Sequence, residues 1–141
     1  MGEFATFVGN HYILCGSFVA LLVLLIWDYI DDYRIGAKLI DPVEATRLIN
    51  RDQAVVLDIR SQAEFKKGHV VDAVHVPLEK IDNYIKTLEH YREKPVIVID
   101  HTGNLTGKAA ETLKKEGFKA IYRLKGGVVS WKDANLPLIS A

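Results

Sequence analysis

Cysteine is nearly absent from this chain: the only one is Cys15, and it lies inside a long apolar run. A single cysteine excludes an intramolecular disulfide, a CxxC redox motif and a zinc site built on thiolates. The histidines that follow the run have neither HxH nor i,i+4 spacing, so we expect no metal ion and no cofactor. The rest of the chain is free of cysteine, which is typical of proteins in reducing compartments.

A surplus of charge of either sign is also missing, because Lys and Arg total 18 and Asp and Glu total 18. No run of basic residues alternates with aromatic ones, so we expect no nucleic-acid partner. At 141 residues the chain is long enough for one small domain with an extension.

Charged residues are missing altogether between Phe4 and Trp27. This segment is apolar on every side, and as a helix it can cross a hydrocarbon core ~30 Å thick at ~1.5 Å per residue. A cleaved signal peptide begins with basic residues and ends in small ones, whereas here Glu3 precedes the run and Trp27 ends it. We predict a retained transmembrane helix over residues 12–30, after a short extracytoplasmic tail over residues 1–11. A buried core helix is the alternative.

Basic residues flank this segment on one side only. Arg34 and Lys38 follow it, whereas the N-terminal flank contains neither Lys nor Arg. Acidic residues such as Asp28, Asp31 and Asp32 count for little in the positive-inside rule. We therefore expect the membrane bilayer as a partner, with the N-terminus outside and the C-terminal part in the cytoplasm.

A pair of small residues, Gly16 and Ala20, lies at the spacing that lets transmembrane helices approach each other closely. This pair would support a homo-oligomer through the helix. Such pairs are commonplace in apolar helices, so the simpler alternative is that these two residues contact lipid and support no helix pairing.

The charged part of the chain follows a short juxtamembrane linker, expected over residues 31–40, and forms a domain over residues 41–141. Asp41 and Pro42 mark a helix start as N-cap and first helical residue. Ser61, with Glu64 after it, forms a capping box that opens a second, short helix.

Short apolar runs alternate with helical patterns along this domain. Strands are expected over residues 54–58, 73–76, 95–99 and 120–124, and further helices over residues 81–91, from 107 to at least 113, and after 127. Strands that alternate with helices predict a parallel sheet covered on both faces.

The segment between the strand at 95–99 and the following helix is short and polar. A tight loop in this position lets backbone N–H groups and a helix N-terminus converge, which is the geometry of an anion site. The loop consists of Asp100, His101, Thr102, Gly103, Asn104, Leu105 and Thr106.

Five pieces of this domain, in order, resemble the signatures of the rhodanese-like family. They are Val56-Leu57-Asp58-Ile59-Arg60 with Glu64-Phe65 and Gly68-His69, then Val76-Pro77, the strand and loop at 95–106, Leu124-Lys125-Gly126-Gly127, and Trp131 with Leu136-Pro137. The likeness covers about residues 40 to 138 and implies a three-layer α/β/α fold with a five-stranded parallel sheet, preceded here by one transmembrane helix. The anchor plus one such domain resembles single-pass rhodanese-like proteins of the bacterial inner membrane.

The loop departs from that family at the residue that matters most. The resemblance implies a nucleophilic Cys that carries a persulfide, and this chain has Asp100 there. A carboxylate cannot form a persulfide. His101 and Leu105 stand where the family often has positive groups, and Thr106 stands where related phosphatases have an arginine. We therefore expect no catalytic residues and a vestigial active-site loop.

Asp100 has two interpretations. It could act as an acid, base or nucleophile at a helix N-terminus, or its carboxylate could cap the amides of its own loop. The second is favoured, because no other carboxylate or Lys is placed beside it by sequence. Asp58 and Arg60 are expected to support the loop, with Arg60 pairing with an acidic side chain or packing nearby.

These observations favour a membrane-tethered, catalytically inactive rhodanese-like domain that binds another membrane or cytoplasmic protein. One alternative is an enzyme of sulfur transfer or hydrolysis that uses the loop from Asp100 to Thr106. Another is a structural role, in which the helix joins a membrane complex that the domain merely shapes.

Overall fold

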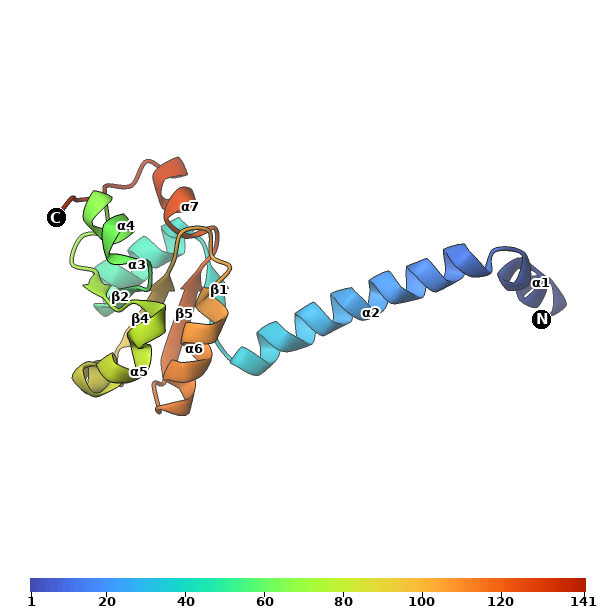
Figure 1. Ribbon diagram of the computed structural model, residues 1–141, viewed down its shortest axis with the longest axis horizontal. Helices are drawn as coiled ribbons and strands as arrows, with labels where there is room; N and C mark the ends of the chain where they lie inside the picture. Colours follow the sequence, from blue (N-terminus) through green and yellow to red (C-terminus); the bar gives the residue numbers. More distant parts are fainter. The chain divides into compact units, whose positions relative to one another are not determined.

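The computed structural model describes residues 1–141, except for the side chains of Asp31 and Asp32. It divides into two units, Met1–Arg34 and Ile35–Ala141, which are described separately (Figure 1). Sequence-based expectations that concern the side chains of Asp31 and Asp32 therefore lie outside the described residues.

The first unit is helical. It contains α1, Gly2–Asn10, and most of α2, Tyr12–Ile35. Among the described residues, α2 is the one helix long and apolar enough to cross a membrane, with a mean hydropathy of 2.3 over its most apolar stretch. None of that stretch is buried within the protein.

The segment expected as a linker over residues 31–40 is largely regular structure. Helix α2 continues to Ile35, and strand β1 occupies Lys38–Ile40. Gly36 has a φ of +65°, the left-handed conformation in which glycine commonly ends a helix. Two residues therefore separate helix from strand.

The second unit is built on a five-stranded, wholly parallel sheet in the order β1-β5-β4-β2-β3. The remaining strands are β2 Val55–Asp58, β3 Val74–His75, β4 Pro95–Ile99 and β5 Ala120–Leu124. The expected rhodanese-like α/β architecture with five parallel strands is confirmed.

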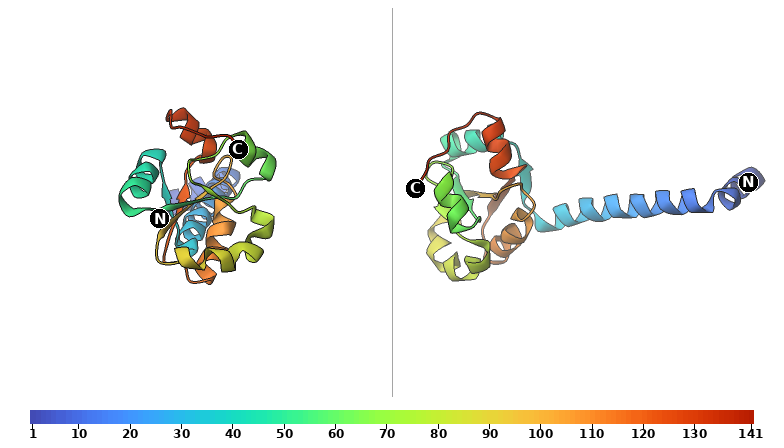
Figure 2. Two further views of the ribbon diagram at one scale, coloured as in Figure 1. Left: turned by 90° about the vertical axis from the view of Figure 1, so that its left-hand side faces the viewer. Right: turned by 45° about the horizontal axis from the view of Figure 1, so that its top comes forward.

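Helices cover both faces of this sheet (Figure 2). One face packs against α3 Pro42–Asp52 and α7 Gly127–Asp133, and the other against α5 Ile81–Tyr84, a 3₁₀ helix at Ile85–Tyr91, and α6 Thr106–Lys115. Central strand β4 supplies both cores, because alternate residues point to opposite faces. Val96 and Val98 join one cluster, whereas Ile97 and Ile99 join the other.

The helix starts expected from the sequence are present. The Asp41 carboxylate accepts a hydrogen bond of 2.8 Å from the Glu44 N–H at the start of α3. Both bonds of the capping box between Ser61 and Glu64 form at the start of α4, Gln62–Lys67. These local interactions depend on residues three apart, which explains why the sequence reveals them.

One helix differs in detail from the expectation. The helix expected over residues 81–91 turns from α to 3₁₀ after Tyr84. A period of three places Ile85 and Leu88, both buried, and the partly buried Tyr91 on one side. Helix α6, expected to reach at least residue 113, ends at Lys115, and Phe118 beyond it is buried against the same core.

Candidate functional site

The candidate site lies at the carboxyl ends of β2 and β4, two neighbouring strands in the interior of the sheet. Asp58 ends β2 and Asp100 follows β4 directly. The Ile59 N–H donates to the Ile99 carbonyl over 3.0 Å, which extends the pairing of the two strands to their ends. In open parallel sheets this edge is where ligands bind.

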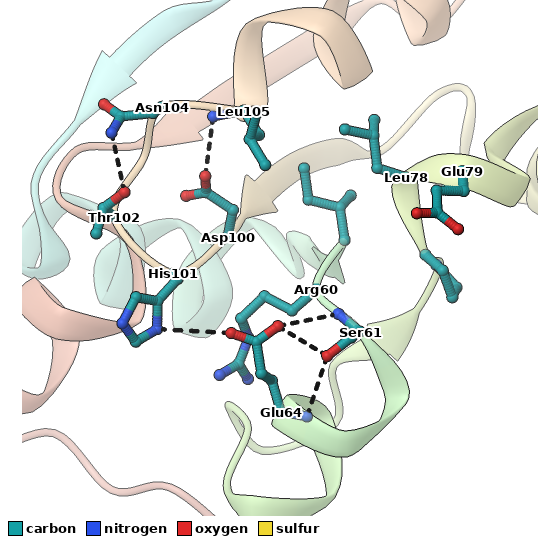
Figure 3. A pocket seen from close by; sticks show the side chains of 12 residues that line it. Arg60, Ser61, Glu64, Leu78, Glu79, Asp100, His101, Thr102, Asn104 and Leu105 are labelled. Carbon is teal, nitrogen blue, oxygen red and sulfur yellow. Dashed lines mark hydrogen bonds and ion pairs between the residues drawn. The ribbon is translucent and has the colours of Figure 1, made fainter.

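Asp100 directs its carboxylate back into its own loop. The side chain is buried, at 3% exposure, and each oxygen accepts a backbone hydrogen bond. One oxygen accepts from the Gly103 N–H. The other accepts from the Leu105 N–H over 2.9 Å, the bond drawn in Figure 3. The Thr106 hydroxyl donates to the Gly103 carbonyl over 2.9 Å. The loop thus closes around a carboxylate of the protein itself.

The first turn of α7 supports the loop from behind. The Val128 N–H donates to the Asp100 carbonyl over 2.9 Å, and the Val129 N–H donates to the His101 carbonyl over 3.2 Å. Gly127 directly precedes these two residues with a φ of +59°, and a Cβ at this position would lie 2.5 Å from the Asp100 carbonyl oxygen. The approach of α7 to the loop therefore requires a glycine here.

Arg60 is held beneath the site by Asp58. Its Nε donates to one carboxylate oxygen of Asp58 over 2.9 Å and its Nη2 to the other over 2.6 Å. The same Nη2 donates to the Gly68 carbonyl over 2.8 Å. Both side chains are buried, so this guanidinium is committed to internal partners. Arg60 lines the cavity next to the loop, whereas Asp58 does not.

Glu64 connects α4 with the loop. Its Oε2 accepts from the Ser61 hydroxyl over 2.8 Å, and its Oε1 lies 4.0 Å from the His101 Nδ1 (Figure 3). The hydrogen bond from the Ser61 side chain, opposed by partial burial and aided by the charges of Arg60 and His101, lowers the pKa of Glu64 below its ordinary 4.5. Glu64 is therefore ionised at neutral pH.

A cavity of about 520 Å³ opens between the loop and the segments that follow β2 and β3. Five of the expected loop residues line it, whereas Gly103 and Thr106 are not in its lining. Sequence reasoning missed the lining contributed by Ser61, Glu64, Leu78 and Glu79. The available signal was the Val76-Pro77 motif, because the residues just after it meet the loop across the carboxyl ends of the strands.

Metal ligation and thiol chemistry have little basis at this site. Among the residues whose side chains are described, no group of three or more His, Cys, Asp or Glu side chains could hold a metal ion. The one cysteine of the sequence, Cys15, lies on α2 in the other unit.

Comparisons with known proteins agree with the fold. A model of the rhodanese-like domain matches residues 41–134. The chain is 40% identical to the uncharacterized Escherichia coli protein YibN over 140 residues, which cover 99% of this chain and 98% of that protein. It is 33% identical over 95 residues to the thiosulfate sulfurtransferase GlpE of Coxiella burnetii, covering 67% of this chain and 87% of GlpE. The crystal structure of a rhodanese-related protein from Thermoplasma volcanium superposes with a TM-score of 0.66 at 26% identity, over 74% of this chain and 99% of that one.

Proposed function

The chain belongs to the rhodanese-like domain family. We propose that it is a membrane-tethered, non-catalytic member of this family that works by binding another protein. The observation that carries this proposal is the double hydrogen bond of Asp100. Its carboxylate occupies the amides of Gly103 and Leu105, which would otherwise hold an anion. The loop is therefore filled by a fixed side chain.

Sulfur transfer by the family's mechanism needs a thiolate at the first loop position. Asp100 cannot carry a sulfane sulfur, and the one cysteine in the sequence lies in the apolar segment. Arg60, the basic side chain that lines the cavity, is paired with Asp58. These facts favour a binding role over the sulfurtransferase activity that the name of the GlpE relative states.

The tether in this proposal is α2. Its length and apolar composition suit a single membrane crossing, and the basic residues Arg34 and Lys38 after it favour a cytoplasmic domain. By resemblance the membrane would be the bacterial inner membrane. The protein bound would then be a membrane or cytoplasmic one.

A sulfurtransferase assay tests the non-catalytic part of the proposal. The full chain in detergent micelles is mixed with thiosulfate and cyanide, and thiocyanate is measured against buffer. An active thiosulfate sulfurtransferase in the same detergent serves as the positive control. We expect no turnover above buffer, and measurable turnover would show that the chain is an enzyme.

Crosslinking in native membranes, followed by mass spectrometry, tests the binding part. A photoreactive residue replaces the exposed Leu105 in one variant and the exposed Glu116, outside the candidate site, in another. We expect a discrete protein adduct that depends on the Leu105 position. Identical adducts from both positions, or none, would contradict binding through this site.

A further inference from the structure

We propose that the cavity beside the loop binds a Lys or Arg side chain presented by the partner protein. This inference rests on the proposed function, since it names the chemistry by which the partner is recognised. The cavity is lined by apolar and by acidic side chains, which suit the stem and the charged end of a long basic side chain.

Two loop amides and the Arg60 guanidinium, which would attract an anion, already have partners within the protein. Asp100 accepts the N–H groups of Gly103 and Leu105. The Arg60 guanidinium is bound to Asp58 and to the Gly68 carbonyl, and its side chain is only 6% exposed. The resemblance to the family implies amide donors facing an anion in the loop. In this chain an anion would instead meet the buried Asp100 carboxylate, which already accepts from two of these amides.

The remaining charged groups of the lining are mostly acidic. Glu64 and Glu79 line the cavity together with Asp100, and the Glu64 side chain is 42% exposed. The Oε1 of Glu64 lies 4.0 Å from the His101 Nδ1, which is beyond hydrogen-bond distance, so this oxygen can accept a hydrogen bond from an incoming cation. Carboxylates that are ionised and partly shielded from water attract a cation more strongly than fully exposed ones do.

The apolar part of the lining suits the stem of such a cation. Ile59, Pro77, Leu78 and Leu105 contribute to it. Leu105 is 58% exposed, and Figure 3 shows that it and Leu78 come from different segments of the lining. Lys and Arg bury their methylene stems along apolar surface while the charged end remains in a polar environment. A small inorganic cation would leave Leu78 and Leu105 exposed to water.

Peptide binding to the full chain in detergent micelles tests this inference. The probes are acetylated, amidated pentapeptides with Lys, norleucine or Glu between pairs of glycines, and the readout is the ¹⁵N–¹H shift of the loop amides from Thr102 to Leu105. We expect saturable shifts with the Lys peptide, weaker binding of the norleucine peptide and none of the Glu peptide. Added salt should weaken the binding of the Lys peptide, because salt screens the attraction between partly exposed charges.

Two matched substitutions test the acidic part. Glu64→Gln and Glu79→Gln should each raise the Kd of the Lys peptide roughly two- to fivefold, and about tenfold together. Gln still completes the Ser61 capping box, so the fold is retained. Glu116→Gln, an exposed change outside the cavity, should leave the Kd unchanged.

Equal binding of the Lys and norleucine peptides, or a Kd that the double variant leaves unchanged, would overturn the inference. Thiosulfate binding that shifts the same amides would also overturn it, because the cavity would then select anions. Its failure differs from failure of the proposed function. Turnover of thiosulfate contradicts the proposed function, whereas a partner crosslinked through Leu105 without any preference for Lys contradicts this inference alone.

Discussion

Asp100 has two roles in its loop. It stands at the first loop position and also supplies the negative charge that the loop amides hold. Such a side chain stabilises the loop without a ligand, since the Gly103 and Leu105 N–H groups would otherwise lack a partner near the buried end of β4. Replacing it should therefore alter both stability and chemistry.

The substitution Asp100→Cys, made in a Cys15→Ala background, should give a thiol with a pKa below the ~8.5 of a free thiol, because the same amides would stabilise the thiolate. It should also lower the free energy of unfolding by on the order of 1 kcal/mol, since a thiolate accepts hydrogen bonds less well than a carboxylate with two oxygens. The rate of alkylation by iodoacetamide against pH measures the first effect, and denaturant unfolding the second.

Glu116→Cys in the same background is the control for that titration, because it is exposed and outside the loop. A pKa for Cys at position 100 at or above the control value would mean that the loop amides do not converge on this position. The interpretation of the loop as a vestigial anion site would then be wrong.

Sequence and structure differ at single residues in an instructive way. Asp100 caps amides that lie only three and five residues after it, so this capping could be predicted from the sequence. The pairing of Arg60 with Asp58 was expected only as pairing with some acid, because the choice depends on how the chain turns after β2. The approach of Leu78 and Glu79 to the loop was not foreseen, since it depends on the neighbouring positions of β2, β3 and β4 in the sheet.

At the level of elements, the start of α4 should respond to acid. Because the folded pKa of Glu64 lies below 4.5, its ionised form contributes stability above the unfolded pKa, and this contribution is lost as the pH falls through the lower folded pKa. The difference in unfolding free energy between the native chain and Glu64→Gln should therefore be constant near neutral pH and shift in favour of Gln under acid conditions. Urea unfolding from about pH 3 to about pH 7 measures it. A difference independent of pH would show that the capping box does not depend on the charge of Glu64.

The turn between β5 and α7 should tolerate no side chain at Gly127. Gly127→Ala combines a positive φ with a Cβ placed 2.5 Å from the Asp100 carbonyl oxygen, and we expect a loss of about 3 kcal/mol or more in unfolding free energy. Gly117→Ala is the matched control, because its φ is +87° but nothing lies within 4 Å of the added Cβ. It should cost about 1 kcal/mol from the backbone alone. Equal losses in the two variants would show that α7 can move away from the loop.

Helices and strands marked by a cap or by a continuous apolar run could be predicted from the sequence, whereas the short strand β1 and the 3₁₀ helix could not. Helices α3 and α4 begin at caps, and β4 is a continuous apolar run, as expected of a strand buried on both faces. Strand β1 has three residues, of which only Ile40 is buried, so no alternation could distinguish it from a linker. The change to 3₁₀ after Tyr84 keeps Ile85 and Leu88 on one side, as an α-helix would, and therefore leaves no distinct signature in the sequence.

For the whole molecule, α2 should hold the chain in a membrane. After alkaline carbonate extraction we expect the full chain in the membrane pellet, because α2 is apolar and carries no charge from Tyr12 to Trp27. Substituting Leu21→Lys together with Leu24→Lys should release it, since each charge costs roughly 3 kcal/mol near the middle of a bilayer. A native chain that washes off would show that α2 is not a membrane span.

The orientation should follow the basic residues. A reporter fused after Ala141 should behave as cytoplasmic, so that fused alkaline phosphatase is inactive, because Arg34 and Lys38 lie on that side. Moving the charges, with Arg34→Gln and Lys38→Gln combined with Glu3→Lys and Ala5→Lys, should raise the phosphatase activity. An active fusion of the native chain would mean that the positive-inside rule fails for this protein.

The strand order of the sheet also fixes a sequence of events during synthesis. Strand β1 follows α2 after two residues, yet it pairs with β5. Lys38 can therefore pair with Tyr122, and Ile40 with Leu124, only after β5 has been synthesised. The ribosome must therefore translate nearly the whole domain before the edge of the sheet can close, a long-range pairing that is intrinsically slow. Through most of this interval α2 is already made while its neighbouring strand has no partner. If α2 is a membrane span, it would be available for insertion before the sheet of the domain behind it is complete.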